Sequence, residues 1–167
     1  PIQTQSRSSR NGIWVGALAL QALNRNTKLI LAGSHGDHPS AGPGTEQYFY
    51  ETAAGCIAGV ASGGHSWGGT RRFKTGQVTN YGTPLESEFL GRICQAAVGM
   101  DVEHANRAVL SLLDRYEDKL KDAPRGATLH ELYDLDTERP LPAYRQIYDN
   151  VVGELRELGV PIEKYSD

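Results

Sequence analysis

The sequence has little cysteine, and this shortage excludes one class of protein. Its two cysteines, Cys56 and Cys94, are too few for a disulfide-rich secreted scaffold. Both fall in apolar patterns of helical spacing, which favours reduced core thiols and a cytoplasmic protein. Residues 1–10 lack the apolar segment of a signal peptide, which fits the same expectation.

The chain also lacks a surplus of positive charge and a long hydrophobic run. Its 17 lysines and arginines are outnumbered by 20 acidic residues, giving a formal net charge of -3. Binding to nucleic acid is not expected, because neutralising phosphates requires clustered basic side chains. The longest apolar run, residues 13–20, is much shorter than the roughly 20 residues of a membrane span. Neither nucleic acid nor a membrane is an expected partner.

Helical patterning covers most of the chain. Apolar residues recur every three or four positions, and helix-capping residues precede the periodic segments. The candidate N-caps are Ser9 or Asn11, Thr45, Thr83, Asp101 and Thr128, with capping boxes completed by Glu86 and Glu131. The predicted helices are 11–23, 46–58, 84–98, 102–120, a short helix from 129 that ends before a turn at 136–142, and a long helix from 142 that ends at Gly159.

Strand signals are few. The apolar run 28–33 predicts a buried parallel strand, and residues 59–62 are a weaker candidate. A lone parallel strand cannot satisfy both of its edges, so its flanking strands are expected from elsewhere. The simplest interpretation is one segment, 1–167, with a helical portion at 100–167, that forms the carboxyl-terminal part of a larger α/β protein. One subunit of an interleaved assembly is the alternative.

A loop rich in glycine and proline follows the predicted strand. The run 33–46 carries His35, Asp37, His38 and Glu46. Because sites in α/β folds are built at the carboxyl ends of parallel strands, we expect this loop to border a functional site. A solvated turn is the alternative interpretation.

Several segments in order resemble one known family. Residues 39–46, Pro-Ser-Ala-Gly-Pro-Gly-Thr-Glu, resemble the segment Pro-Cys-Ala-Gly-Pro-Cys-Thr-Glu of monomethylamine methyltransferases. These are corrinoid-dependent enzymes of methylamine-using methanogens and related anaerobes. The likeness continues through 59–62, 82–88, 96–99, 113–117, 123–126, 131–134, 144–149 and 157–159.

The resemblance implies that this chain is the last third of a TIM (β/α)8 barrel that transfers a methyl group from a methylamine-like donor to a corrinoid (cobalamin). The corrinoid would be carried by a partner protein. The family's pyrrolysine would lie in the amino-terminal part, supplied by the same enzyme or by a companion chain. Members of the family form homo-oligomers, so a homo-oligomer is also implied.

Departures from the family cluster in the loop. The resemblance places His35 at a family glutamine near the pyrrolysine ring, while the family's Tyr-Tyr becomes Asp37-His38 and its two cysteines become Ser40 and Gly44. These changes imply a changed methyl donor. A histidine can protonate or orient a departing nitrogen or oxygen near neutral pH. We therefore predict His35 as the catalytic group.

Substrate binding is predicted for four further residues. Asp37, His38 and Glu46 share the loop with His35. Arg10 lies just before the first predicted helix, where an anionic group is favoured, and a strand expected around residues 2–6 would bring it to the same mouth. A surface or interface role is the alternative for Arg10.

Two other functions stay open at this point. The chain could be a noncatalytic assembly subunit or remnant that keeps the helical packing of such an enzyme. Alternatively, His35 and His38, with Asp37 or Glu46, could bind zinc or iron in a metal-dependent enzyme, since imidazole and carboxylate groups suit these metals.

Overall fold

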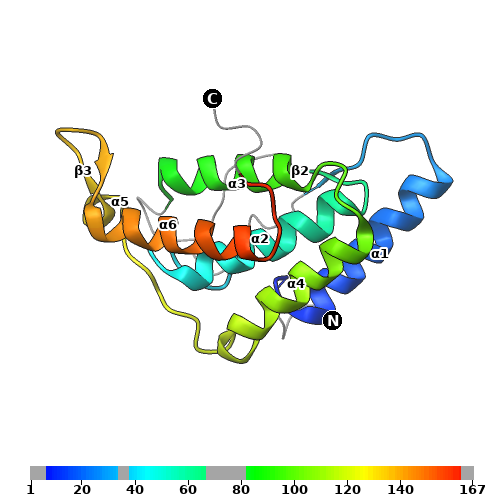
Figure 1. Cartoon of the computed structure of the whole chain (residues 1–167), viewed down its shortest axis with the longest axis horizontal. Coiled ribbons are helices and arrows are strands. Elements are labelled where there is room, and N and C mark those ends of the chain that lie inside the picture. The colour runs from blue at the N-terminus through cyan, green and yellow to red at the C-terminus, as the bar shows by residue number, and fades with distance from the viewer. Residues whose placement is uncertain (1–6, 34–37, 67–81, 163–167) are drawn as a thin grey trace.

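The structure, a computed structural model, describes residues 7–33, 38–66 and 82–162 of the chain. Helices dominate these residues, as the sequence predicts (Figure 1). The helices are α1 (Arg10–Asn26), α2 (Glu46–Ala61), α3 (Pro84–Ala97), α4 (Val102–Tyr116), the 3-10 helix η2 (Glu117–Lys119), α5 (Leu129–Leu132) and α6 (Pro142–Glu157). The strands are β1 (Ala32–Gly33), β2 (His65–Ser66), β3 (Tyr133–Asp134) and β4 (Arg139–Pro140).

Two short strands form a parallel pair joined by α2. In the register of this pair, Ala32 lies opposite His65 and Gly33 opposite Ser66. The pair Ala32–His65 is made by the His65 N–H, which donates to the carbonyl oxygen of Leu31 at 2.9 Å. The unit β1–α2–β2 is therefore a strand–helix–strand crossover, the building block of parallel α/β folds.

The position of the second strand corrects two expectations. Residues 59–62 were the candidate strand, but α2 continues to Ala61 and β2 begins at His65. Helical hydrogen bonding continues to the end of this run, where the amide of Ser62 donates to the carbonyl oxygen of Ala58 at 3.2 Å. The expectation that all flanking strands come from elsewhere is wrong for one edge of β1, which β2 covers.

The helix starts follow the predicted caps. Ser9 accepts from the Gly12 amide, Thr45 from the Tyr48 amide, and Asp101 from two amides of the first turn of α4. The helix predicted to reach Leu120 is α-helical only to Tyr116 and then tightens into η2. The predicted turn at 136–142 contains part of an antiparallel hairpin, β3–β4, whose two-residue strands are too short to show an alternating pattern.

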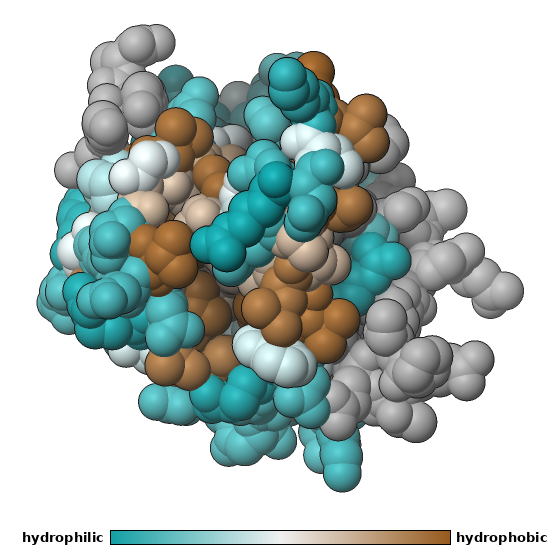
Figure 2. All heavy atoms as spheres, turned by 90° about the vertical axis from the view of Figure 1, so that its right-hand side faces the viewer, coloured by the Kyte–Doolittle hydropathy of each residue, from teal (hydrophilic) through white to brown (hydrophobic). Residues whose placement is uncertain are grey.

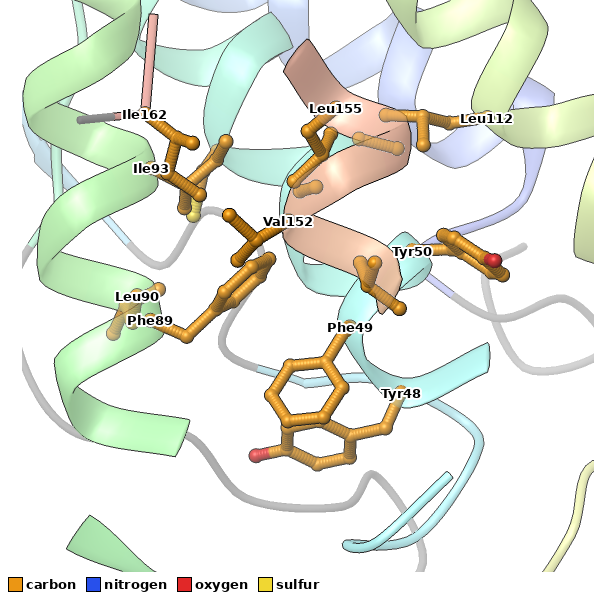
Figure 3. Close-up of a cluster of buried hydrophobic side chains, with 14 of the residues drawn as sticks. Tyr48, Phe49, Tyr50, Phe89, Leu90, Ile93, Leu112, Val152, Leu155 and Ile162 are labelled. Carbon is orange, nitrogen blue, oxygen red and sulfur yellow. The ribbon is translucent and has the colours of Figure 1, made fainter. Parts of the chain in front are cut away.

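The hydrophobic core surrounds α2, which packs against α1, α3, α4 and α6. Phe49 of α2 is fully buried, and its ring centroid lies 4.9 Å from that of Phe89 on α3 (Figure 3). The ring centroid of Tyr148 on α6 lies 5.8 Å from that of Phe49. These edge-to-face contacts fix the angle between the helices more sharply than aliphatic packing alone. The buried Cys56 and the half-buried Cys94 are free thiols, as predicted. None of the helices that the structure describes is long and apolar enough to cross a membrane.

Candidate active site at the loop after β1

The loop after β1 leads directly into α2, and the structure describes it from His38 onward. Residues 39–43 are buried although glycine and proline make up most of them. The alternative of a solvated turn concerned the polar residues His35, Asp37 and His38, and the burial of 39–43 leaves it open. A buried irregular segment must find partners for its backbone groups, and these partners define the site.

Glu51 of α2 is the first of these partners. Its carboxylate is 1 % exposed and accepts hydrogen bonds from the amides of Ser40 (2.6 Å) and Ala41 (3.0 Å). It also accepts from the Ser8 hydroxyl and from the side-chain amide of Gln47 at 2.9 Å. Both oxygens are thus occupied by donors, which offsets the cost of burying the group. Glu51 joins the loop, α2 and the segment before α1 at one point.

A backbone crossing holds the middle of the loop. The amide of Gly42 donates to the carbonyl oxygen of Pro124 at 2.8 Å, and the amide of Ala127 donates to that of Pro43 at 2.9 Å. A Cβ atom added to Gly42 would lie 1.6 Å from the carbonyl oxygen of Arg125, so a side chain cannot fit there. The loop is therefore clamped against residues 124–127, far along the chain.

A second buried carboxyl group, that of Glu86, lies at the start of α3. It accepts from the Thr83 amide at 2.9 Å, as the capping box predicts, and from the hydroxyl of Tyr144 on α6, also at 2.9 Å. Burial raises the pKa of Glu86 to about 7, although hydrogen bonds from Thr83, Tyr144 and the Gly44 amide act in the opposite direction. Through Gly44, this carboxyl group also contacts the end of the loop.

Tyrosine hydroxyls complete this second cluster. Burial, followed by the nearby Glu86 carboxyl, raises the pKa of Tyr144 far above its usual value, so its hydroxyl stays protonated. The Thr83 hydroxyl lies 2.8 Å from it, and the Leu85 amide donates to the Tyr133 hydroxyl at 3.0 Å. The amino end of α3 is thus bonded to α6 and to the hairpin.

Arg10, a predicted substrate-binding residue, opens α1 and lies on the surface. Its guanidinium is paired with Glu117 at 2.9 Å and lies 3.5 Å from Asp114. Its backbone amide also donates to Glu117. The structure nevertheless links its segment to the loop, because the Ser8 hydroxyl and the Ser40 amide donate to the same oxygen of Glu51.

The loop residues predicted as functional have mixed outcomes. His38 is half-buried at the start of the described loop, and Glu46 lies exposed in the first turn of α2. His35 and Asp37 lie outside the described residues, as does the strand expected at residues 2–6. Within ranges 7–33, 38–66 and 82–162, no three His, Cys, Asp or Glu side chains gather as a metal site requires. Metal binding through His35 and His38 therefore stays a prediction.

Sequence reasoning missed the two buried carboxyl groups as organisers of the loop. The capping-box pattern identified Glu86 only as a helix-start residue. For Glu51 the available signal was its i, i+4 spacing from Gln47 inside an otherwise apolar helix face. Neither pattern could show partners as distant as Tyr144 and Ser8, which only the tertiary fold brings near.

Parallel strands joined by a helix, with a buried loop leaving the first strand, place this chain in the α/β class of folds. The sequence model of the monomethylamine methyltransferase MtmB family matches residues 1–160. The chain belongs to this family, and the resemblance seen in the sequence is confirmed.

Curated relatives and solved structures agree with this assignment. Monomethylamine methyltransferase MtmB2 of Methanosarcina acetivorans is 31% identical over 95% of this chain and 34% of its own length. MtmB1 of Methanosarcina barkeri is 30% identical over the same shares. The crystal structure of the Methanosarcina barkeri enzyme superimposes with a TM-score of 0.85 over 93% of this chain and 33% of its own. The crystal structure of a hydroxylamine complex of MtmB gives 0.86 over 95% and 34%. The chain thus spans about a third of the length of these relatives.

Proposed function

We propose that this chain is the carboxyl-terminal third of a TIM-barrel methyltransferase that transfers a methyl group from a methylamine-like donor to a corrinoid protein. Family membership over residues 1–160 supports the reaction class. The supporting observation in the structure is the unit β1–α2–β2, with its buried loop leaving the carboxyl end of β1. In barrels of parallel strands, catalytic groups lie at this end.

The charge of the loop favours an amine donor over an anionic one. Residues 33–46 contain no lysine or arginine, and the described carboxyl groups on the loop or in contact with it are those of Glu46, Glu51 and Glu86. The guanidinium of Arg10 is already paired with Glu117. A methylammonium cation is compatible with such surroundings, whereas an anionic donor would find little compensating charge.

In this proposal the chain's own residues position the donor and move a proton. His35 holds the donor in line or, when the amine is held unprotonated, gives the departing nitrogen the proton it needs to leave as a neutral amine, while Asp37, His38 and Glu46 bind the donor. Arg10, predicted to bind substrate, is instead paired with Glu117. A corrinoid on the partner protein supplies the methyl acceptor, and a pyrrolysine in the other two thirds of the enzyme supplies the group that holds the amine. Glu51 and Glu86 act only by fixing the loop, because both carboxyl groups are buried and hydrogen-bonded to donors of the protein itself.

The departures from the family in this loop narrow the substrate class. Asp37-His38 replaces two tyrosines with a carboxylate and an imidazole, both smaller and more polar, and Ser40 and Gly44 replace cysteines. More polar surroundings favour a methylated amine that carries a further polar group. We therefore propose a polar, methylated amine as the donor.

The test is methyl transfer by a complete enzyme. This chain replaces the matched third of the Methanosarcina barkeri methyltransferase, and methylation of its corrinoid protein is followed spectroscopically with monomethylamine and with polar methylamines. His35→Ala is expected to lower kcat/KM by about 100-fold, the usual contribution of general acid–base catalysis. His104→Ala, a change to a histidine that contacts the Leu158 carbonyl oxygen, is the control.

Two results would contradict the proposal. If the folded chimaera transfers no methyl group from any of these amines, the chain is a noncatalytic member of the family. If His35→Ala transfers the methyl group at the unchanged rate, His35 has no part in the chemistry, and only the position of the loop at the site is left of the proposal.

A further inference from the structure

Helix α1 has apolar side chains on faces that no described residue covers. Trp14, Val15, Leu18 and Leu23 are 61%, 53%, 44% and 46% exposed, while Leu20 of the same helix is buried. A helix that is apolar on all sides is normally buried on all sides. The exposed side chains of α1 are therefore of the kind that is normally found in a protein interior.

The run that leads into β1 shows the same property. Leu29 is 68% exposed and Ile30 is 82% exposed. Both residues precede β1, which begins at Ala32. Their exposed side chains extend the uncovered apolar surface of α1 toward the start of the parallel pair.

The exposed residues continue into a groove on the same side of the molecule. Figure 2, which views the α1 end, shows apolar side chains gathered over this face. The groove, of about 450 Å³, lies between α1, α2 and α4 and is lined by Trp14, Leu18, Val109 and Leu113 among others. Val102 and Leu110 of α4 extend it and are 56% and 38% exposed.

The remaining two thirds of the family fold are the occupant that these observations favour. The relatives keep the fold of this chain, with a TM-score of 0.85, yet the chain covers only 33% of the solved structure. A second copy of the chain is the other occupant to be tested, and the oligomeric state of the isolated chain separates the two.

We propose that the apolar surface of residues 14–30, which we call the α1 face, is where the rest of the methyltransferase fold packs. An apolar helix of the remaining part lies along Trp14, Val15 and Leu18, and further apolar elements cover Leu29 and Ile30. The proposal depends on family membership and not on the methyl-transfer reaction.

The experiment compares the same substitutions in two settings, the chain alone and the chimaera with the Methanosarcina barkeri enzyme. Leu18→Glu and Ile30→Glu change exposed side chains, so each is expected to shift the Tm of the isolated chain by at most about 2 °C. In the chimaera, both are expected to lower the Tm by about 10 °C, because they bury a charge. Leu135→Glu, at a hairpin residue that is 51% exposed, is the control and is expected to be neutral in both.

Hydrogen exchange supplies the second measurement. Amides of residues 14–30 are expected to exchange at least tenfold more slowly in the chimaera than in the isolated chain. If the chimaera does not fold, the two parts are produced separately and mixed, and co-elution that Leu18→Glu abolishes supports the proposal.

Three outcomes would overturn it. Equal tolerance of Leu18→Glu in both settings shows that the α1 face stays uncovered in the full fold. A stable dimer of the isolated chain that Leu18→Glu dissociates assigns the face to a second copy. Separate parts that do not associate also contradict the proposal. All these readouts are structural, so a chimaera that folds with a protected α1 face but transfers no methyl group refutes only the proposed function.

Discussion

At Gly42 the loop after β1 passes the segment before α5 without room for a side chain. The same is true from the other side, because a Cβ on Gly126 would lie 2.3 Å from the carbonyl carbon of Gly42. Gly126 also has φ of +74°, a conformation that side chains disfavour. The sequence shows both glycines, but a glycine-rich loop does not reveal which glycine makes a close contact.

Gly42→Ala is expected to destabilise the protein by about 3 kcal/mol or more, because backbone atoms would have to move apart. The matched control is Gly91→Ala on α3, where nothing lies within 4 Å of the new Cβ. This control is expected to stabilise by about 0.5–1 kcal/mol through helix propensity. Urea unfolding measures both, and equal effects of the two substitutions would refute the close crossing.

Burial of Glu86 makes the free energy of unfolding depend on pH, and the direction of its pKa shift gives the sign of this dependence. Its pKa is raised from 4.5 to about 7 in the folded state, mainly by burial. The folded protein therefore holds this proton where the unfolded chain has released it. The stabilisation that this bound proton gives to the folded state is complete below about pH 4.5 and is lost as the pH rises through about 7.

Because of Glu86, the free energy of unfolding is expected to fall as the pH rises from 4.5 to about 7. Glu86→Gln, which mimics the protonated form, is expected to remove the contribution of Glu86 to this fall. Urea unfolding across that range measures it. Glu88→Gln, at an exposed position of the same helix, should keep the decline. An unchanged slope in Glu86→Gln would show that another group titrates.

Among the elements, the loop of residues 38–45 depends most on one side chain. The Glu51 carboxylate binds four donors, including the amides of Ser40 and Ala41. An amide at this position would turn its NH₂ group toward some of these donors and leave them unsatisfied.

Glu51→Gln is accordingly expected to cost about 2–3 kcal/mol and to speed hydrogen exchange at Ser40 and Ala41. Glu46→Gln, one turn earlier and exposed, should change neither quantity. NMR-detected exchange checks the result. If the two amides stay protected in Glu51→Gln, other contacts hold the loop.

The elements also show what a single sequence can and cannot predict. Helix starts were predictable at Thr45, Thr83, Asp101 and Thr128, because capping is a local interaction. Among the paired strands, β1 falls inside the predicted run 28–33, whereas β2 was not predicted, since it is two residues long and owes its existence to pairing with β1. A partner 33 positions away, as in the pair of Ala32 and His65, leaves no local pattern.

At the scale of the whole molecule, a polar cluster ties three helices together around the core. Glu154 of α6 accepts from the Tyr50 hydroxyl of α2 at 2.7 Å and pairs with Arg115 of α4, whose guanidinium lies 5.4 Å from the Tyr50 ring centroid. Burial and the Glu154 carboxylate together raise the pKa of Tyr50, so its hydroxyl remains a donor.

Glu154→Gln is expected to lower the unfolding free energy by about 1 kcal/mol, a modest value because both charged side chains are about a third exposed. High salt should shrink the difference by screening the pair in the original protein. Glu157→Gln, exposed at the end of α6, is the control. A loss as large in high salt as in low salt would mean that packing, and not charge, is responsible.

The family was visible in the sequence at this scale because its motifs run in order along nearly the whole chain. The site was only partly visible. The loop and its position after β1 were predictable from composition and periodicity, whereas its burial depends on Pro124 and Ser8, which lie far from it in the sequence.

The crossing of Gly42 and residues 124–127 has a practical consequence for changing the specificity of such an enzyme. Insertions, deletions or larger side chains at 39–44 would have to be matched by changes some 80 positions later, which random libraries seldom supply together. A library that changes this loop is therefore best built by varying 39–44 and 124–127 together.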